Sequence, residues 1–121
     1  MKKIAAILIG GSSDQRSSFC GDYFKQYEHI KLDTLRARFK EDRALADCIL
    51  RGCSFVVNQP NASRLARKKY IDLGISQGYS VVGYCFEQRN DNIQLPKYDE
   101  GFDLLCFVRC GDDGFIVEEL E

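Results

Sequence analysis

The chain has 121 residues, of which 45% are hydrophobic, and its 17 basic residues nearly balance 18 acidic ones. This length suits one domain over residues 1–121 with a core of its own. The near-neutral charge excludes a general attraction of the surface to nucleic acid or membrane, so a polyanion would need a local patch. Nucleic acid therefore has no support from net charge as a partner, and no apolar run reaches the roughly 20 residues of a membrane span.

The start of the chain and its cysteines indicate a cytoplasmic protein. Two lysines precede the apolar run 4–9, but this run is short and ends in Gly10-Gly11, which fits a buried strand better than a signal peptide. The six cysteines form no Cys-x-x-Cys pair, and His29 is the single histidine. We expect reduced, mostly buried thiols.

Short apolar runs alternate along the chain with longer polar-periodic ones, which is typical of a parallel sheet with crossover helices. Strands are predicted at 3–9, 29–32, 54–57, 79–86 and 104–108, with a short edge strand at 115–117. Helices are predicted at 17–27, from Asp33 to a stop at Gly52, and at 61–77 before Gly78. The polar segment 87–101 contains Pro96 and shows no period, so we expect a loop.

The two stronger helices show apolar stripes with a 3.6-residue period, which predict their buried faces. The predicted stripes are Leu35, Phe39, Ala46 and Ile49 in the first of them, and Ala66, Tyr70 and Leu73 in the second.

These units predict an α/β fold, a three-layer α/β/α sandwich whose parallel five-stranded sheet has residues 3–9 at its centre. Ligands of such sheets bind at the carboxyl ends of the strands. The segments that follow strands, where we expect a site, are 10–18, 32–36, 58–61 and 87–92.

The segment after the first strand has the layout of a phosphate-binding loop, G-x-x-x-x-G-K-[ST]. It reads Gly10-Gly11-Ser12-Ser13-Asp14-Gln15-Arg16-Ser17, with Gln15 in place of the second glycine and Arg16 in place of the lysine. Such a loop holds phosphate with backbone N–H groups at a helix N-terminus. The alternative is a Ser/Gly-rich turn with Ser17 as the N-cap.

Residues 4–19 resemble the start of P-loop kinases related to phage polynucleotide 5′-kinase. The order of later segments is similar too. Asp33-Thr34-Leu35-Arg36 resembles the D-x-x-R element, 52–71 the third strand with its turn and helix, 78–84 the G-Y-x-V-V-G-Y segment and 100–103 the E-G-F-D segment.

The resemblance implies a P-loop NTPase-like fold, ATP as cofactor and a nucleotide or other phosphate-bearing ligand. It implies Asp33 as general base and Arg36 as an anion contact; Asp33 would also serve as the N-cap of the helix it precedes. It implies that phosphate or nucleotide is bound by Gly10, Gly11, Ser12, Ser13, Arg16, Ser17, Ser18 and Arg89. Ser17 is the candidate ligand for Mg²⁺.

Two segments depart from the family pattern. Asn58-Gln59-Pro60-Asn61 stands in place of D-N-T-N, which removes a carboxylate from the metal region and argues against Mg²⁺. We expect Asn61 to be a helix cap. The segment 87–95 is too short for the family's lid helix and supplies only Arg89. The nearby basic residues Arg64, Arg67 and Lys68 form either a solvated helix face or a phosphate patch.

Three functions follow from these residues. The favoured one is a degenerate kinase-like protein, a pseudoenzyme that binds a nucleotide or phosphorylated ligand weakly without efficient phosphoryl transfer. The second is an active ATP-dependent kinase of a nucleoside or polynucleotide 5′-hydroxyl. The third is a non-catalytic protein-interaction module.

Overall fold

A computed structural model describes residues 3–31, 38–87 and 92–120. The predicted site residues Asp33, Arg36 and Arg89 lie outside these ranges. The elements are β1 (Ile4–Ile9), α1 (Ser13–Tyr23), β2 (Glu28–Ile30), α3 (Arg38–Arg51), β3 (Phe55–Val57), α4 (Arg64–Ser76), β4 (Ser80–Phe86), the 3-10 turn η1 (Tyr98–Glu100), β5 (Leu104–Gly111) and β6 (Gly114–Leu120).

The strands form one sheet in the order β2-β3-β1-β4-β5-β6. The first five are parallel, and β1 lies between β3 and β4, which confirms the predicted central strand. The sheet has a sixth strand beyond the predicted five, because the short edge strand predicted at 115–117 is the full seven-residue strand β6, antiparallel to β5. Only two residues, Asp112 and Asp113, join these strands, and so short a connection permits antiparallel pairing alone.

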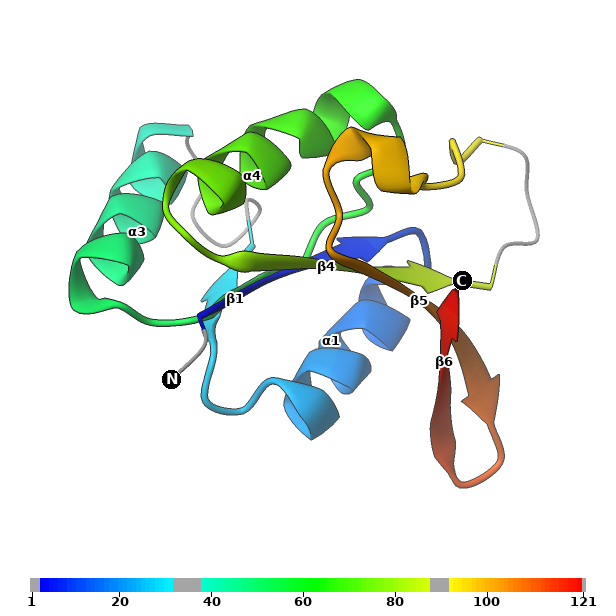
Figure 1. Cartoon of the computed structure of the whole chain (residues 1–121). Helices are drawn as coiled ribbons and strands as arrows, with labels where there is room; N and C mark the ends of the chain where they lie inside the picture. The colour runs from blue at the N-terminus through cyan, green and yellow to red at the C-terminus, as the bar shows by residue number, and fades with distance from the viewer. Residues whose placement is uncertain (1–2, 32–37, 88–91, 121) are drawn as a thin grey trace.

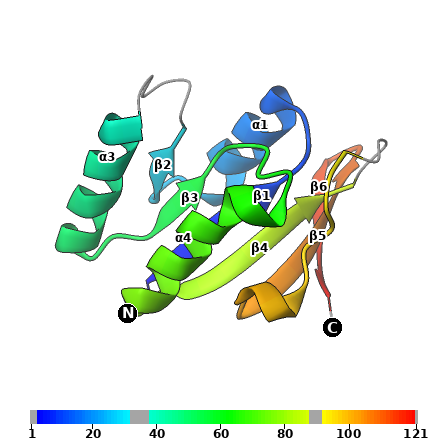
Figure 2. The same cartoon turned by 90° about the horizontal axis from the view of Figure 1, so that it is seen from above.

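The sheet is covered on both faces, with α1 on one side and α3 and α4 on the other (Figure 1). Seen from above, α4 runs alongside the central strands and α3 lies beyond it over the β2 end (Figure 2). Alternate residues of β1 divide between two cores: Ala5, Ile7 and Ile9 face α3 and α4, and Ala6 and Leu8 face α1. The chain is thus an α/β sandwich with a mostly parallel sheet.

The first helix begins four residues earlier than predicted. Ser12, not Ser17, is the N-cap, and it forms a capping box with Gln15 in which each side chain accepts a hydrogen bond from the other's backbone N–H. The serine cluster offered several caps, and only the one with glutamine three residues later completes both bonds. Arg16 and Ser17 therefore lie inside the helix rather than in a loop.

The predicted buried face of α3 was partly wrong. Leu35 lies outside the described residues, Ile49 is half-buried against the core as expected, and Phe39 and Ala46 are exposed. Glu41, Leu45 and Cys48 face the core instead. The true stripe also has helical spacing, but its first member is a carboxylate, which a hydrophobic pattern does not count.

The face predicted for α4 was partly wrong for a related reason. Tyr70 is buried as expected, but Ala66 is exposed and Arg67 is fully buried. Asn61 is not the cap of this helix either; Ser63 is, through a bond from the Ala66 N–H.

Among the residues that the structure describes, no helix is both long and apolar enough to cross a membrane.

Candidate functional site

The segments after β1 and β3 meet at one edge of the sheet. The chain leaves β1 towards α1 on one face and leaves neighbouring β3 towards α4 on the other, which is the topological switch point at which α/β sheets commonly bind ligands. The N–H of Gly10 donates to the carbonyl oxygen of Pro60 at 2.7 Å. Asn61 has a positive φ of 45° and donates its Nδ2 to the Leu8 carbonyl oxygen at 2.7 Å. These bonds fasten the two segments together.

The side chain of Arg16 lies between these two segments and is almost completely buried. Its Nη1 donates to the carbonyl oxygens of Gly11, at 2.7 Å, and Gly10, at 3.4 Å. Its Nε donates to Oδ1 of Asn58 at 3.1 Å. The predicted loop therefore turns carbonyl oxygens towards a resident cation, which is electrostatically the reverse of a ring of N–H groups around phosphate.

Three backbone N–H groups of the same loop have protein acceptors. The Ser12 N–H donates to Gln15 Oε1 at 2.9 Å, and the Gln15 N–H donates to Ser12 Oγ at 3.1 Å. The Arg16 N–H donates to the Ser12 carbonyl at 3.0 Å as an ordinary helical bond. An anion at this helix start would have to compete with the capping box.

The hydroxyl of Ser17 lies among hydrogen-bond donors. The Nδ2 of Asn58 donates to Ser17 Oγ at 3.4 Å, and Lys31 Nζ lies 3.5 Å from the same oxygen. With the Arg16 guanidinium bound to the other end of the Asn58 amide, two cations surround this point. Magnesium prefers carboxylate and water oxygens, so these residues do not fit it. No group of three or more His, Cys, Asp or Glu in the described ranges is placed to share a metal ion.

The positive charge at this edge also acts on the thiol of Cys20, one turn along α1. Burial raises the pKa of Cys20 to about 11, and the charges of Arg16 and Lys31 oppose that rise. The thiol is therefore neutral at physiological pH and acts as core.

The predicted phosphate-binding residues are thus only partly brought together. Gly10, Gly11, Arg16 and Ser17 share one network with Asn58. Ser12 belongs to the capping box, and Ser13 and Ser18 are exposed on α1.

Sequence reasoning missed a buried carboxylate next to this site. Glu41 of α3 is completely buried and accepts a hydrogen bond from the hydroxyl of Tyr70 in α4. Gln59 Nε2 donates to the same carboxylate at 3.5 Å, and Lys69 Nζ lies 3.6 Å from it. The cluster anchors the turn after β3 to both helices. Its only signal in the sequence was the predicted burial of Tyr70, whose hydroxyl requires a partner.

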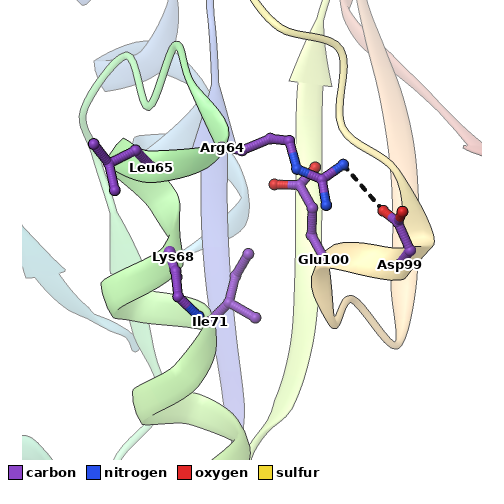
Figure 3. A pocket seen from close by; sticks show the side chains of 6 residues that line it. All are labelled: Arg64, Leu65, Lys68, Ile71, Asp99 and Glu100. Carbon is purple, nitrogen blue, oxygen red and sulfur yellow. Dashed lines mark hydrogen bonds and ion pairs between the residues drawn. The ribbon is translucent and has the colours of Figure 1, made fainter.

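The basic residues at the start of α4 do not form a free cationic patch. Arg64 Nη1 pairs with Asp99 Oδ1 at 3.1 Å across a cavity of about 310 Å³ between α4 and η1 (Figure 3). Lys68, on the same cavity, pairs with Asp72 at 2.8 Å. Arg67 is buried against Glu100. The expectation of a solvated face was wrong for Arg67, because Glu100 from a distant segment neutralises it.

A second, more apolar groove of about 760 Å³ lies between α3 and α4. Leu45, Ile49, Leu50 and Leu73 line it, and Leu50 is 86% exposed. It contains none of the predicted site residues.

Comparison with known proteins bears on the fold. No protein-family model matches the sequence, and no curated protein matches it significantly. A solved chain from the PezAT chromosomal toxin–antitoxin system of Streptococcus pneumoniae is similar with a TM-score of 0.66 and 12% sequence identity. The match covers 89% of this chain and 67% of the other. At this identity the similarity shows a shared fold.

Proposed function

We propose that this chain is a kinase-like domain that binds a nucleotide or other phosphate-bearing ligand weakly and does not transfer phosphoryl groups efficiently. One observation carries the proposal. The Arg16 guanidinium is buried between the segments that follow β1 and β3, bonded to the carbonyl oxygens of Gly10 and Gly11.

Binding of a phosphate between these segments requires Arg16 to leave these carbonyls. A hydrogen bond involving a charged group contributes about 1.5–3 kcal/mol. Losing the shorter bond, to Gly11, together with the Asn58 bond would cost roughly 3 kcal/mol, or about a hundredfold in affinity. New contacts of the guanidinium to phosphate offset part of this cost. The ligand would therefore bind, but weakly.

Efficient transfer needs more than binding. In P-loop kinases the rate comes from positioning, from a metal that neutralises developing charge and from arginines, which alone contribute about 10³–10⁵ in rate. Here Asn58 replaces the metal-region carboxylate, and its amide oxygen is occupied by Arg16. The alternative, an active kinase, requires a magnesium site that these residues do not offer.

The binding half of the proposal is tested by calorimetric titration with ATP, ADP and inorganic phosphate, each with and without Mg²⁺. We expect millimolar dissociation constants that Mg²⁺ does not improve. Micromolar binding that depends on Mg²⁺ would contradict the proposal.

Asn58→Asp separates the two explanations for the altered turn. If the Arg16 guanidinium occupies the place that a phosphate would take, the new carboxylate pairs with it, raises thermal stability and weakens nucleotide binding further. If position 58 had merely lost a metal ligand, the variant would gain Mg²⁺-dependent nucleotide binding, and blockage by Arg16 would be the wrong explanation.

Catalysis is tested with labelled ATP and 5′-hydroxyl oligonucleotides or nucleosides, using wild type beside Asp33→Asn. We expect no transfer above background in either protein. Robust transfer by wild type that is lost in Asp33→Asn would establish the active-kinase alternative instead.

A further inference from the structure

The C-terminus of α3 ends in a backbone motif that places two cysteines together. Gly52 has a φ of +72°, and its N–H donates to the Ile49 carbonyl at 3.0 Å. The N–H of Cys53 donates to the Cys48 carbonyl, also at 3.0 Å. These two bonds define a Schellman motif, in which the side chains at the first and sixth positions normally contact each other. Here both positions are cysteine.

The side-chain contacts agree with the backbone. Cys48 Sγ lies 3.1 Å from the carbonyl oxygen of Cys53, to which it donates. The hydroxyl of Tyr79 donates to the same oxygen at 2.6 Å and holds this end of the turn in place. A disulfide needs two residues whose backbones lie close together. The hydrogen bond from the Cys53 N–H to the Cys48 carbonyl brings these two backbones close. Both thiols are free in this structure.

The two thiols differ in surroundings. Cys53 is partly exposed, and Arg51 Nη1 donates a hydrogen bond to its sulfur at 3.3 Å. Arg51 is shared with two carboxylates, Asp47 at 2.9 Å and Glu28 at 3.3 Å. Cys48 is completely buried, and its burial, with a smaller contribution from Cys53, raises its pKa. Cys53 is accessible to a reagent, and Cys48 only to Cys53.

We propose that Cys48 and Cys53 form a modification site for hydroperoxides, which convert the pair into an intramolecular disulfide. The Cys53 thiolate attacks the peroxide O–O bond and becomes a sulfenic acid, while the peroxide leaves as hydroxide or alkoxide. The Cys48 sulfur then displaces the sulfenic hydroxyl, which departs as water with the Cys48 proton. The peroxide is reduced by two electrons, and the chain loses two hydrogen atoms.

The other cysteines supply internal controls. Cys110 is exposed, and the donor to its sulfur among the described residues is a neutral amide, Gln15 Nε2, at 3.3 Å. Cys106 lies four residues before it on β5, a separation of roughly 13 Å along a strand, which is too long for a disulfide.

Trypsin makes the bond easy to detect, because it cleaves between the two cysteines at Arg51. After treatment of the full chain with hydrogen peroxide, we expect peptides 44–51 and 52–64 to be joined, at the mass of their sum less two hydrogens, and to separate on reduction. The proposal would be overturned if the disulfides formed joined other cysteines. It would also be overturned if Cys48 and Cys53 stayed free in chains whose Cys110 was already oxidised.

Two variants test the roles of the thiols. In Cys48→Ser the joined peptide is lost and Cys53 remains as a sulfenic acid that dimedone traps. In Cys110→Ser the joined peptide forms as in wild type. If Cys48→Ser leaves Cys53 unreactive towards both peroxide and dimedone, or if Cys48 is trapped in Cys53→Ser, the assigned order of reaction is wrong.

Discussion

Arg67 shows how one residue can connect distant parts of this chain. Its Nε and Nη2 donate to the two carboxylate oxygens of Glu100 at 2.7 and 3.0 Å, and its Nη1 donates to the Asn61 carbonyl at 3.0 Å. The side chains are 0% and 4% exposed, so neither charge is hydrated. A buried pair of this kind contributes little net stability, but losing one partner leaves an uncompensated charge. It ties α4, η1 and the turn after β3 into one unit.

Arg67→Ala should lower the free energy of unfolding by about 3–5 kcal/mol, because the charge of Glu100 would then be buried without a countercharge. Arg64→Ala is the matched control, since its pair with Asp99 is exposed and should contribute under about 1 kcal/mol. Urea denaturation of both variants measures the difference. If both variants lost equally little free energy of unfolding, Glu100 would have moved into water once its partner was removed.

The same pair gives a pH dependence. Burial raises the pKa of Glu100, but the hydrogen bonds from Arg67 and the Lys97 N–H outweigh it, so the pKa is lowered from its ordinary 4.5. The ionised form is therefore favoured by folding, and this contribution is complete above pH 4.5 and lost as pH falls through the lower folded value. Unfolding midpoints measured between pH 6 and 3, about the acid range of a carboxyl, should fall more steeply for wild type than for Glu100→Gln. Parallel curves would contradict the assignment.

At the scale of elements, two glycines differ in whether the packing around them leaves room for a side chain. A Cβ on Gly83 of β4 would lie 2.7 Å from Leu105 Cδ2 and 2.8 Å from Phe102 Cε1. A Cβ on Gly21 of α1 would meet nothing within 4 Å. The first glycine is needed where β4 and β5 pack under the η1 segment, and the second is not.

Gly83→Ala should therefore destabilise the protein by about 1–3 kcal/mol through overpacking. Gly21→Ala should stabilise it by up to about 1 kcal/mol, because alanine is the better helix former. Thermal unfolding of both measures the contrast. A loss of stability in Gly21→Ala would show that α1 needs this glycine for a reason that the contacts do not reveal.

The strands of this protein were easier to predict from the sequence than the buried faces and the first residues of its helices. The strands were predicted within a few residues, because buried parallel strands are continuous apolar runs. The helix faces were less predictable: Glu41 and Arg67 occupy core positions that a hydrophobic pattern assigns to solvent. The start of α1 depended on the choice among neighbouring serines, which the capping box with Gln15 decided.

For the whole molecule, the position of each strand in the sheet predicts how well its backbone amides are protected from hydrogen exchange. β1 and β4 have hydrogen-bonded neighbours on both sides, and their side chains belong to both cores. β6 is an edge strand with mostly exposed residues. Amide hydrogen exchange should be slowest in β1 and β4 and fastest among strands in the outward N–H groups of β6. Comparable protection in β6 would mean that this edge is covered in solution, for example by a second chain.

The sequence by itself determined the α/β class, the central position of β1 and the expectation of a site at the carboxyl ends of the strands, because apolar runs and their spacing are local properties. Only the tertiary structure decided what lies between the segments that follow β1 and β3. Whether Arg16 reaches out to a phosphate or inward to Gly10 and Gly11 depends on the helix start at Ser13 and on Asn58, 42 residues away. The pairing of Arg67 with Glu100 likewise joins residues 33 apart. A buried charge is stable only beside its partner, and that partner is fixed by the fold rather than by neighbouring residues.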